Sequence, residues 1–332
     1  MTARLSILTA WLLLLACYSP AEHSTVADCG VWKIRVSDNS LIGVLEGVPE
    51  ARALQSVGNT EFLVSSGTGE IHIVNSPDML ITETLTVGFA GGAGYRSIIM
   101  PGAGSVYLTS STGSILEIDL TGMSLVADFN AGAVPDRMAA LPYSDEFFYV
   151  TDMSTGKILE VSTVTNSVTR ESDALDAVPS AIAAESFLNS FLITVTSDET
   201  GLCGILNLGT FYFEEFSFGH ACHDVTAFPA ESIWAVSHPE WNLSSGSISI
   251  CSNFSFPEVE AISIPGHPMQ ICSVPGTTLF YVLSYLGDGN SLLLGVNYLT
   301  RTIDSQMEIP GFPWDVTSHG NGEYVLVLTS EL

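Results

Sequence analysis

Basic residues are scarce in this sequence. Lysine and arginine together number 9, whereas aspartate and glutamate number 36, so the net charge is −27 at pH 7. A chain of this charge repels the phosphates of nucleic acids and the headgroups of anionic lipids. We therefore expect no nucleic-acid partner and no electrostatic attachment to a membrane surface.

Long apolar runs are scarce as well. The one that stands out, Leu5–Ala16, has 12 residues, fewer than the about 20 residues of a membrane-spanning helix. It follows a short start that carries Arg4, and it ends with a small residue directly before Cys17. A charged start, an apolar run of this length and a small residue at its end are typical of a secretory signal peptide.

The end of this run, Leu14–Cys17, resembles the lipobox of bacterial lipoproteins, in which the cysteine is lipidated and becomes the new N-terminus. The resemblance implies a signal peptide over residues 1–16, a lipidated Cys17 with a tether over 17–28, and a folded domain over 29–332. An ordinary signal peptide that happens to end in a cysteine is the alternative interpretation.

A lipidated N-terminus would place the protein in the bacterial cell envelope. Tyr18 does not match the aspartate that retains some lipoproteins at the inner membrane, which favours the outer membrane over the inner one. The folded domain would then lie in the periplasm or at the cell surface. We expect its contact with the membrane to come from the lipid alone.

Cysteine is infrequent too. The sequence has 6 cysteines, so an odd number follows Cys17 and at least one thiol should lack an intramolecular partner. Export permits disulfides. The repeat described below places Cys203 and Cys222 near one end of the same hairpin, which makes them the candidate disulfide.

Helical periodicity is absent after the signal, since no segment sustains apolar residues at i, i+3, i+4 and i+7. Short apolar segments recur instead, and their aligned positions lie 42 to 47 residues apart. A glycine turn follows each segment, and a loop with glycine or proline closes each unit. The aligned apolar positions are Phe62, Tyr107, Tyr149, Leu192, Trp234, Tyr281 and Tyr324. The loop prolines are Pro49, Pro135, Pro179, Pro268 and Pro313.

Each unit reads as four short strands, rich in β-branched and aromatic residues and separated by Gly, Pro, Asn and Asp. Four strands every 40 to 50 residues are typical of a β-propeller blade, whereas β-solenoids usually repeat at shorter lengths. The segment 31–47 reads as the last two strands of a unit, and the C-terminus supplies the first two. We therefore predict an all-β, seven-bladed propeller that is closed by pairing N- and C-terminal strands in one blade.

One unit carries a family resemblance. The segment Tyr149–Val168, YVTDMSTGKILEVSTVTNSV, and the AVPSAIA that follows it after a short loop resemble the YVTN-repeat β-propellers. Their unit runs Tyr-Val-Thr-Asn, Gly, a Val/Ile-rich strand and a Gly-x-x-Pro loop, and here Asp152 replaces the asparagine. The other units match this pattern in outline. The resemblance implies the propeller fold and says little about function.

Arginines gather in one class of loop, the loops that join the last strand of one blade to the first strand of the next around the central channel. Arg52, Arg96 and Arg137 fall there on three consecutive blades, with Asp315 in another such loop. An arc of guanidinium groups could bind a carboxylate or a phosphate through bidentate hydrogen bonds. The alternative is that each arginine pairs with a local carboxylate such as Asp136.

The segment 219–224, GHACHD, holds the densest group of potential metal ligands. His220, His223 and Asp224 lie within it, and His267 occupies the place of His220 in the next blade. Zinc or copper accepts such donors. The spacing matches no standard zinc motif, however, so a polar loop is the alternative. We predict no cofactor and leave a divalent metal open.

Catalytic motifs are missing: the sequence has no Gly-x-Ser-x-Gly elbow, no His-Glu-x-x-His and no phosphate-binding Gly-x-x-x-x-Gly-Lys-Ser/Thr. We therefore favour a non-enzymatic binding or scaffold module for a protein, peptide or glycan partner of the envelope, with Trp241, Phe312 and Trp314 as candidate anchors. A propeller enzyme with its site at the channel mouth, either a lactonase-like hydrolase or a metal-dependent lyase or oxidoreductase, is the alternative. A structural role in an envelope assembly is a third option.

Overall fold

The computed structural model describes residues 28–87, 95–102, 104–110, 113–141, 144–184, 191–197, 200–228, 232–252 and 258–330. These residues form strands and turns and no helix, so no helix that could span a membrane is found in the described part of the chain. The predicted signal peptide, Cys17 and the tether up to residue 27 lie outside the described residues.

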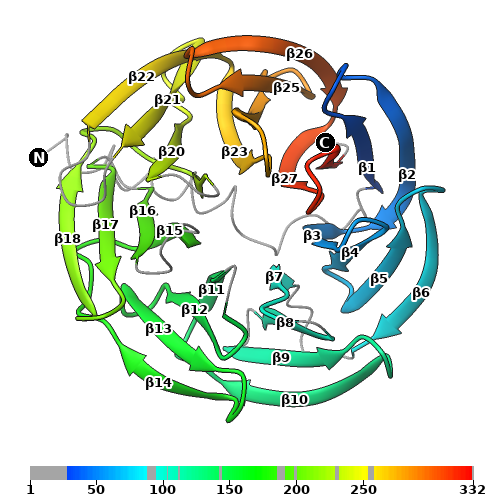
Figure 1. The fold of residues 1–332 in the computed structure, drawn as a ribbon, viewed down its shortest axis with the longest axis vertical. Helices are drawn as coiled ribbons and strands as arrows, with labels where there is room; N and C mark the ends of the chain where they lie inside the picture. The colour runs from blue at the N-terminus through cyan, green and yellow to red at the C-terminus, as the bar shows by residue number, and fades with distance from the viewer. Residues whose placement is uncertain are drawn as a thin grey trace, which may run out of the picture.

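Seven antiparallel sheets of four strands surround a central axis, as the repeat predicts (Figure 1). Six of them use consecutive strands. Three are β3 (Ala51–Val57), β4 (Glu61–Ser66), β5 (Glu70–Asn75) and β6 (Leu80–Thr86); β7 (Tyr95–Ile99), β8 (Ser105–Ser110), β9 (Ser114–Asp119) and β10 (Ser124–Asn130); and β11 (Pro135–Ala140), β12 (Phe147–Asp152), β13 (Lys157–Ser162) and β14 (Ser167–Glu171). The other three are β15 (Pro179–Ala184), β16 (Phe191–Thr196), β17 (Leu202–Asn207) and β18 (Tyr212–Ser217); β19 (Val225–Ala227), β20 (Ile233–His238), β21 (Ser245–Ser252) and β22 (Glu258–Pro265); and β23 (His267–Ser273), β24 (Leu279–Tyr285), β25 (Asn290–Asn297) and β26 (Thr302–Pro310).

Both ends of the chain build the seventh blade, in the order β2, β1, β28, β27. Its strands are β1 (Asp28–Arg35), β2 (Leu41–Pro49), β27 (Phe312–Ser318) and β28 (Tyr324–Ser330). Trp32 pairs with Val327, and the Trp32 Nε1 atom donates a hydrogen bond to Thr329 Oγ1 at 3.0 Å. This pairing completes the seventh blade and closes the ring. The predicted closure is confirmed.

The apolar repeat fills the spaces between blades, but its members are not all equivalent. Tyr107, Tyr149 and Tyr281 share one register, because each pairs with the residue four positions after the one that precedes the β-bulge in the innermost strand. Phe62 and Trp234 lie one residue earlier in their strands. A shift of one residue turns a side chain to the other face of a sheet. In some blades the aligned residue therefore packs into the core on one side of the blade, and in other blades it packs into the core on the other side.

Four of the five aligned prolines are the first or second residue of an innermost strand, where a missing N–H is tolerated. They are Pro135, Pro179, Pro268 and Pro313. The exception is Pro49, which ends β2, the outermost strand of its blade, while Ala51 takes the place of the proline. The sequence alignment was therefore wrong by two residues in this blade, which affects the predicted arginine arc.

The Tyr-Val-Thr-Asp motif has a structural role at Asp152. This carboxylate accepts hydrogen bonds from Ser154 N at 3.0 Å, from Thr155 Oγ1 at 3.0 Å and from Val134 N at 3.1 Å. Burial alone would raise the pKa of Asp152, but these hydrogen bonds outweigh it and lower the pKa. Asp152 thus ties the turn after β12 to the loop before β11, as a turn-forming residue should.

Candidate ligand-binding face and channel

The innermost strands form the wall of the central channel. In six blades a β-bulge lies near the start of this strand. A bulge redirects the side chains that follow it. The residue after the bulge and its equivalent before β19 line a hollow of about 210 Å³, and we name these residues the channel ring. They are Ala53, Ser97, Arg137, Ala181, Asp224, Gln270 and Asp315.

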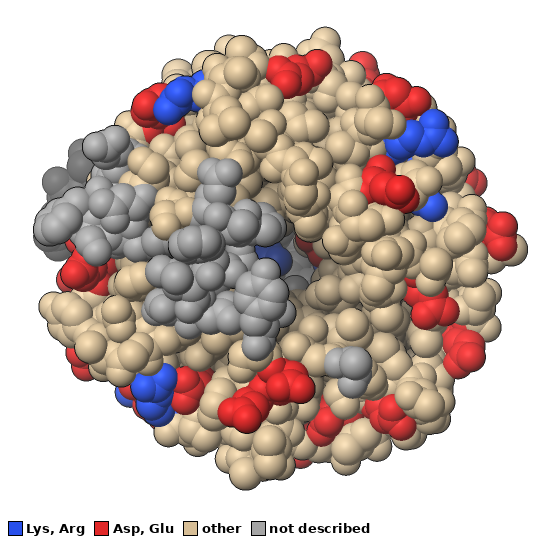
Figure 2. All heavy atoms as spheres, in the orientation of Figure 1, with Lys and Arg blue, Asp and Glu red and all other residues tan. Residues whose placement is uncertain are grey.

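Charge is distributed unevenly around the channel ring. Arg137 is its basic member, and Asp224 and Asp315 are its acids. The innermost strands contact one another in the order β27, β3, β7, β11, β15, β19, β23 and back to β27. Arg137 on β11 therefore lies opposite Gln270 on β23 and Asp315 on β27, with Asp224 beside them. Figure 2 shows basic atoms inside the central opening, whereas acidic side chains are scattered around the perimeter.

Backbone N–H groups hold both carboxylates in place. The Oδ2 atom of Asp315 accepts a hydrogen bond from Leu54 N at 2.7 Å, and its Oδ1 atom accepts one from Val316 N at 2.8 Å. Asp224 repeats this arrangement, with Oδ2 accepting from Ile271 N at 3.0 Å and Oδ1 accepting from the next residue at 2.9 Å. Each aspartate joins its own blade to the next one, so its charge has a fixed position.

Burial changes the ionisation of these two acids. Loss of hydration raises the pKa of Asp315 to about 7, although the N–H of Leu54 and the charge of Arg137 act in the opposite direction. The neighbouring Asp224 carboxylate adds to the increase. Burial also raises the pKa of Asp224. Near neutral pH, Asp315 is therefore partly protonated, and a cation in the channel would favour its charged form.

His223 lies directly before Asp224 and is neutral at physiological pH. Burial, together with repulsion from Arg137, lowers the pKa of His223 to about 4. Its Nδ1 atom donates to the carbonyl oxygen of Met269 at 2.8 Å, since a carbonyl can only accept. The Nε2 atom is then an acceptor, and it is buried without a hydrogen-bond partner among the described residues. The loop thus places a neutral histidine within electrostatic range of Arg137.

The predicted arc of arginines is not formed as the sequence alignment suggested. Arg52 and Arg96 are the second residues of their innermost strands, whereas Arg137 is the third residue of β11. The Arg52 guanidinium lies over the ring of Trp314, with 4.6 Å between its Cζ atom and the ring centroid. The side chain of Arg96 lies outside the described residues. Among the described arginines, Arg137 is the one that lines the hollow, and it does so together with Asp224 and Asp315.

The candidate metal ligands are not brought together. His267 Nδ1 donates to the Pro239 carbonyl at 2.8 Å, and the ring of His220 meets the ring of His238 edge-on with 4.2 Å between centroids. Asp224 points into the channel hollow instead. Within the described ranges, no three His, Cys, Asp or Glu side chains are arranged to hold a metal ion. The sequence spacing put His220, His223 and Asp224 on one loop and His267 in the next blade, but in the structure these side chains contact different partners.

Cys203 and Cys222 lie in the same buried core cluster, together with Cys251. The candidate disulfide between Cys203 and Cys222 is not formed in this structure. Burial raises the pKa of Cys203 and of Cys251, which keeps these thiols protonated. The cluster packs beneath the loop that carries His223 and Asp224.

Aromatic side chains collect on the face where the channel ring lies. The innermost strand starts at this face and the second strand ends there, because the strands of each blade alternate in direction. The Trp241 ring stacks on His267 with 4.6 Å between centroids. Phe312 contacts Tyr285 at 5.0 Å and Trp314 at 5.7 Å between ring centroids. We name this group the mouth aromatics: Trp241, His267, Tyr285, Phe312 and Trp314.

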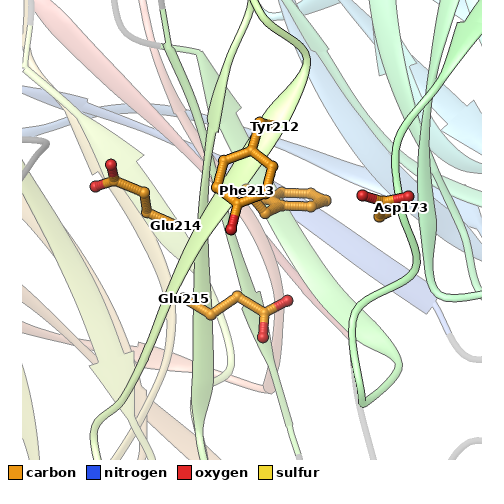
Figure 3. A pocket seen from close by; sticks show the side chains of 5 residues that line it. All are labelled: Asp173, Tyr212, Phe213, Glu214 and Glu215. Carbon is orange, nitrogen blue, oxygen red and sulfur yellow. The ribbon is translucent and has the colours of Figure 1, made fainter.

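A larger hollow of about 450 Å³ lies on the perimeter, along β18. It is lined by Asp173, Tyr212, Phe213, Glu214 and Glu215 (Figure 3). The figure shows the carboxylates pointing in different directions, with Glu214 and Glu215 on opposite sides of the strand. Burial and the nearby Asp176 raise the pKa of Glu215. Because its charged groups do not converge, this hollow is a weaker candidate site than the channel.

Comparison with known proteins shows the fold and no more. No family model matches the chain, and no curated protein matches it. Among the solved structures, hydrazine synthase from Kuenenia stuttgartiensis matches with a TM-score of 0.71 and 12% sequence identity, over 85% of this chain and 95% of that one. An identity this low carries no information on activity. The similarity therefore concerns the fold, which is that of a seven-bladed β-propeller.

Proposed function

We propose that this protein is a lipid-anchored, extracytoplasmic β-propeller that acts as a binding module for a protein, peptide or glycan partner of the cell envelope. The observation that carries the proposal is the common location of the mouth aromatics and the polarised channel ring on one face. Aromatic rings provide large contact areas at a small entropic cost, and a fixed charge beside them gives orientation. The lipid anchor rests on the lipobox resemblance at Cys17.

Changing Cys17 to serine should abolish lipid attachment. We expect the wild-type chain to incorporate radiolabelled palmitate and to sediment with membranes, and the Cys17→Ser variant to do neither, because serine has no thiol to acylate. Cys29→Ser, which changes a cysteine buried in the propeller, serves as the matched control and should keep the label. A Cys17→Ser variant that keeps both label and membrane association would contradict the anchor.

A photo-reactive amino acid in place of Trp241 should cross-link a partner in living cells. Trp241 is 48% exposed on the proposed binding face, whereas Tyr212 is 63% exposed on the perimeter and provides the control. We expect discrete adducts from position 241 and none from position 212, identified by mass spectrometry. Equal labelling from both positions, or from neither, would argue against the mouth face as the binding surface.

A propeller enzyme is the second candidate, and Asp315 favours it. A carboxyl group whose pKa is about 7 could donate or accept a proton near neutral pH, and such groups cluster at catalytic sites. Its two oxygens are already held by backbone N–H groups, however, which suits a fixed charge better than a mobile proton carrier. Hydrolysis of a lactone by the wild type, but not by Asp315→Asn, would favour the enzyme.

A further inference from the structure

We propose that the channel binds a small zwitterion, with the carboxylate of the ligand on Arg137 and its ammonium group on Asp315 and Asp224. This inference rests on the proposed function, since it assigns a ligand class to the channel of the same face. It follows from three features of the channel ring: its polarity, the rigidity of its charges and its size.

The polarity matches a molecule that has opposite charges at its two ends. The ring has one guanidinium on β11, and on its opposite side an arc in which Asp224, Gln270 and Asp315 occupy three consecutive blades. A guanidinium offers five donors in a plane and binds a carboxylate through two parallel hydrogen bonds. Two carboxylates and an amide oxygen can accept the three N–H groups of an ammonium ion. An anion alone or a cation alone would use only half of this ring.

The charges of the arc are fixed before any ligand arrives. Each carboxylate accepts two backbone hydrogen bonds, between 2.7 and 3.0 Å long, and still has unused lone pairs, because two carboxylate oxygens offer about four acceptor positions. Arg137 is anchored through its backbone, whose N–H donates to Thr151 Oγ1 at 3.0 Å. The two carboxylates therefore need little reordering when a ligand binds, which reduces the entropic cost that weakens flexible sites.

Arg137 is the described cation whose charge acts on both carboxylates of the arc. Hydration lost on burial raises the pKa of Asp315 to about 7 even though Arg137 lies across the channel. An ammonium group beside this carboxylate would favour its charged form and lower its pKa, so binding at neutral pH should release protons. Asp224 and Asp315, on either side of Gln270, would supply the negative charge that an ammonium site requires.

The size limits the ligand. The hollow has a volume of about 210 Å³, whereas drug-sized pockets begin at about 300 Å³. The ligand should therefore be comparable to a free amino acid or to a dipeptide, which carries its ammonium group and its carboxylate at opposite ends. Both ligands carry one ammonium group and one carboxylate, and they differ in the distance between these two charges.

A series of ω-amino acids can measure that separation. We would titrate glycine, β-alanine, 4-aminobutyrate and 6-aminohexanoate into the full-length protein in detergent by calorimetry, beside dialanine, butyrate and butylamine. We expect one zwitterion to bind at least 10-fold more tightly than butyrate or butylamine, with a buffer-dependent enthalpy that reports proton release. A preference for a short ω-amino acid would indicate that the ligand is a free amino acid. A preference for dialanine would indicate that it is a dipeptide.

Variants separate the two ends of the ligand. Arg137→Gln should weaken zwitterion and butyrate binding at least 10-fold and spare butylamine, with partial rescue by Arg137→Lys, which keeps the charge. Asp315→Asn should do the reverse, weakening zwitterion and butylamine and sparing butyrate. Arg301→Gln removes a cation from the perimeter, where Arg301 pairs with Glu260, and should change nothing. Circular dichroism would verify that each variant is folded.

Two outcomes would overturn the inference. One is that no zwitterion binds more tightly than butyrate or butylamine. The other is that binding is equal in the wild type, Arg137→Gln and Asp315→Asn. If either occurs while position 241 still cross-links a partner, the zwitterion site fails and the binding module stands. If cross-linking fails and the zwitterion binds, the proposed partner-binding face fails and the channel site stands.

Discussion

Replacing Trp234 with alanine should lower the free energy of unfolding by about 3–5 kcal/mol, as expected for a large aromatic side chain removed from a packed core. Trp234 is fully buried, and its ring packs near Phe216 with 5.9 Å between centroids. Its core cluster includes Cys222 and Val225, which flank the loop with His223 and Asp224. The cavity would therefore loosen the channel wall as well as the blade. Urea unfolding monitored by circular dichroism would measure the change.

Trp234→Phe is the matched control. The Trp234 Nε1 atom is buried without a hydrogen-bond partner among the described residues, so phenylalanine removes a polar group that contributes nothing to the fold. We expect this variant to cost less than about 1.5 kcal/mol, because it keeps an aromatic ring in the core. Similar losses for alanine and phenylalanine would show that the indole, and not core packing, stabilises this interface.

Asp315 should make the protein less stable as the pH rises from about 4 to about 7. Its pKa is about 7 in the folded state against 3.8 in the unfolded chain. The unfolded chain therefore loses its proton first, and the stabilisation that is present below pH 4 is lost by pH 7 and does not change further above it. The full shift would correspond to ~4 kcal/mol, and solvent in the channel reduces this to about 2 kcal/mol.

Asp315→Asn isolates this contribution. Asparagine keeps one acceptor oxygen for Leu54 or Val316 and loses the other, so the variant should be less stable than the wild type at pH 5. At pH 8 the difference should shrink or reverse, because asparagine does not ionise. Gln270→Leu changes the channel without a titratable group and should shift stability equally at both pH values. A pH-independent difference for Asp315→Asn would contradict the raised pKa.

The fold was predictable from the sequence because a propeller repeats its signals. The period near 43 residues, the glycine turns and the half-units at both ends were sufficient for the blade number and for the closure through β1 and β28. The register of the strands within each blade could not be predicted from the sequence. Phe62 and Trp234 were aligned with Tyr107, although they lie one residue earlier, because any large apolar residue satisfies a sequence pattern.

The channel site was predictable in part. Arg137, Asp224 and Asp315 were selected from the sequence, but Arg137 was grouped with Arg52 and Arg96, and Asp224 with a metal site. The bulge at the start of each innermost strand decides these assignments, since it turns one residue into the channel and its neighbour away from it. Counting from the first residue of the strand, Pro135 or Ala51, would have separated Arg137 from Arg52.

The hydrogen bonds of the channel ring could not be predicted from the sequence. The acceptors Asp224 and Asp315 lie 47 and 261 residues from the N–H groups that they join across the blade boundary. No local pattern records such contacts, and the pKa of Asp315 depends on them and on burial. The state of the thiols could not be predicted from the sequence either. Cys203 and Cys222 lie in the same core cluster, as their place in the repeat suggested, but they do not form a disulfide.

The most direct test of the zwitterion site in the channel is a crystal structure of the protein with the tightest-binding ω-amino acid at saturating concentration. We expect the ligand in the channel, with its carboxylate on the Arg137 guanidinium and its nitrogen within hydrogen-bond distance of Asp315. A channel that contains only water, with the guanidinium of Arg137 bonded directly to Asp224 or Asp315, would contradict the account and would make the channel ring a purely structural feature of the propeller.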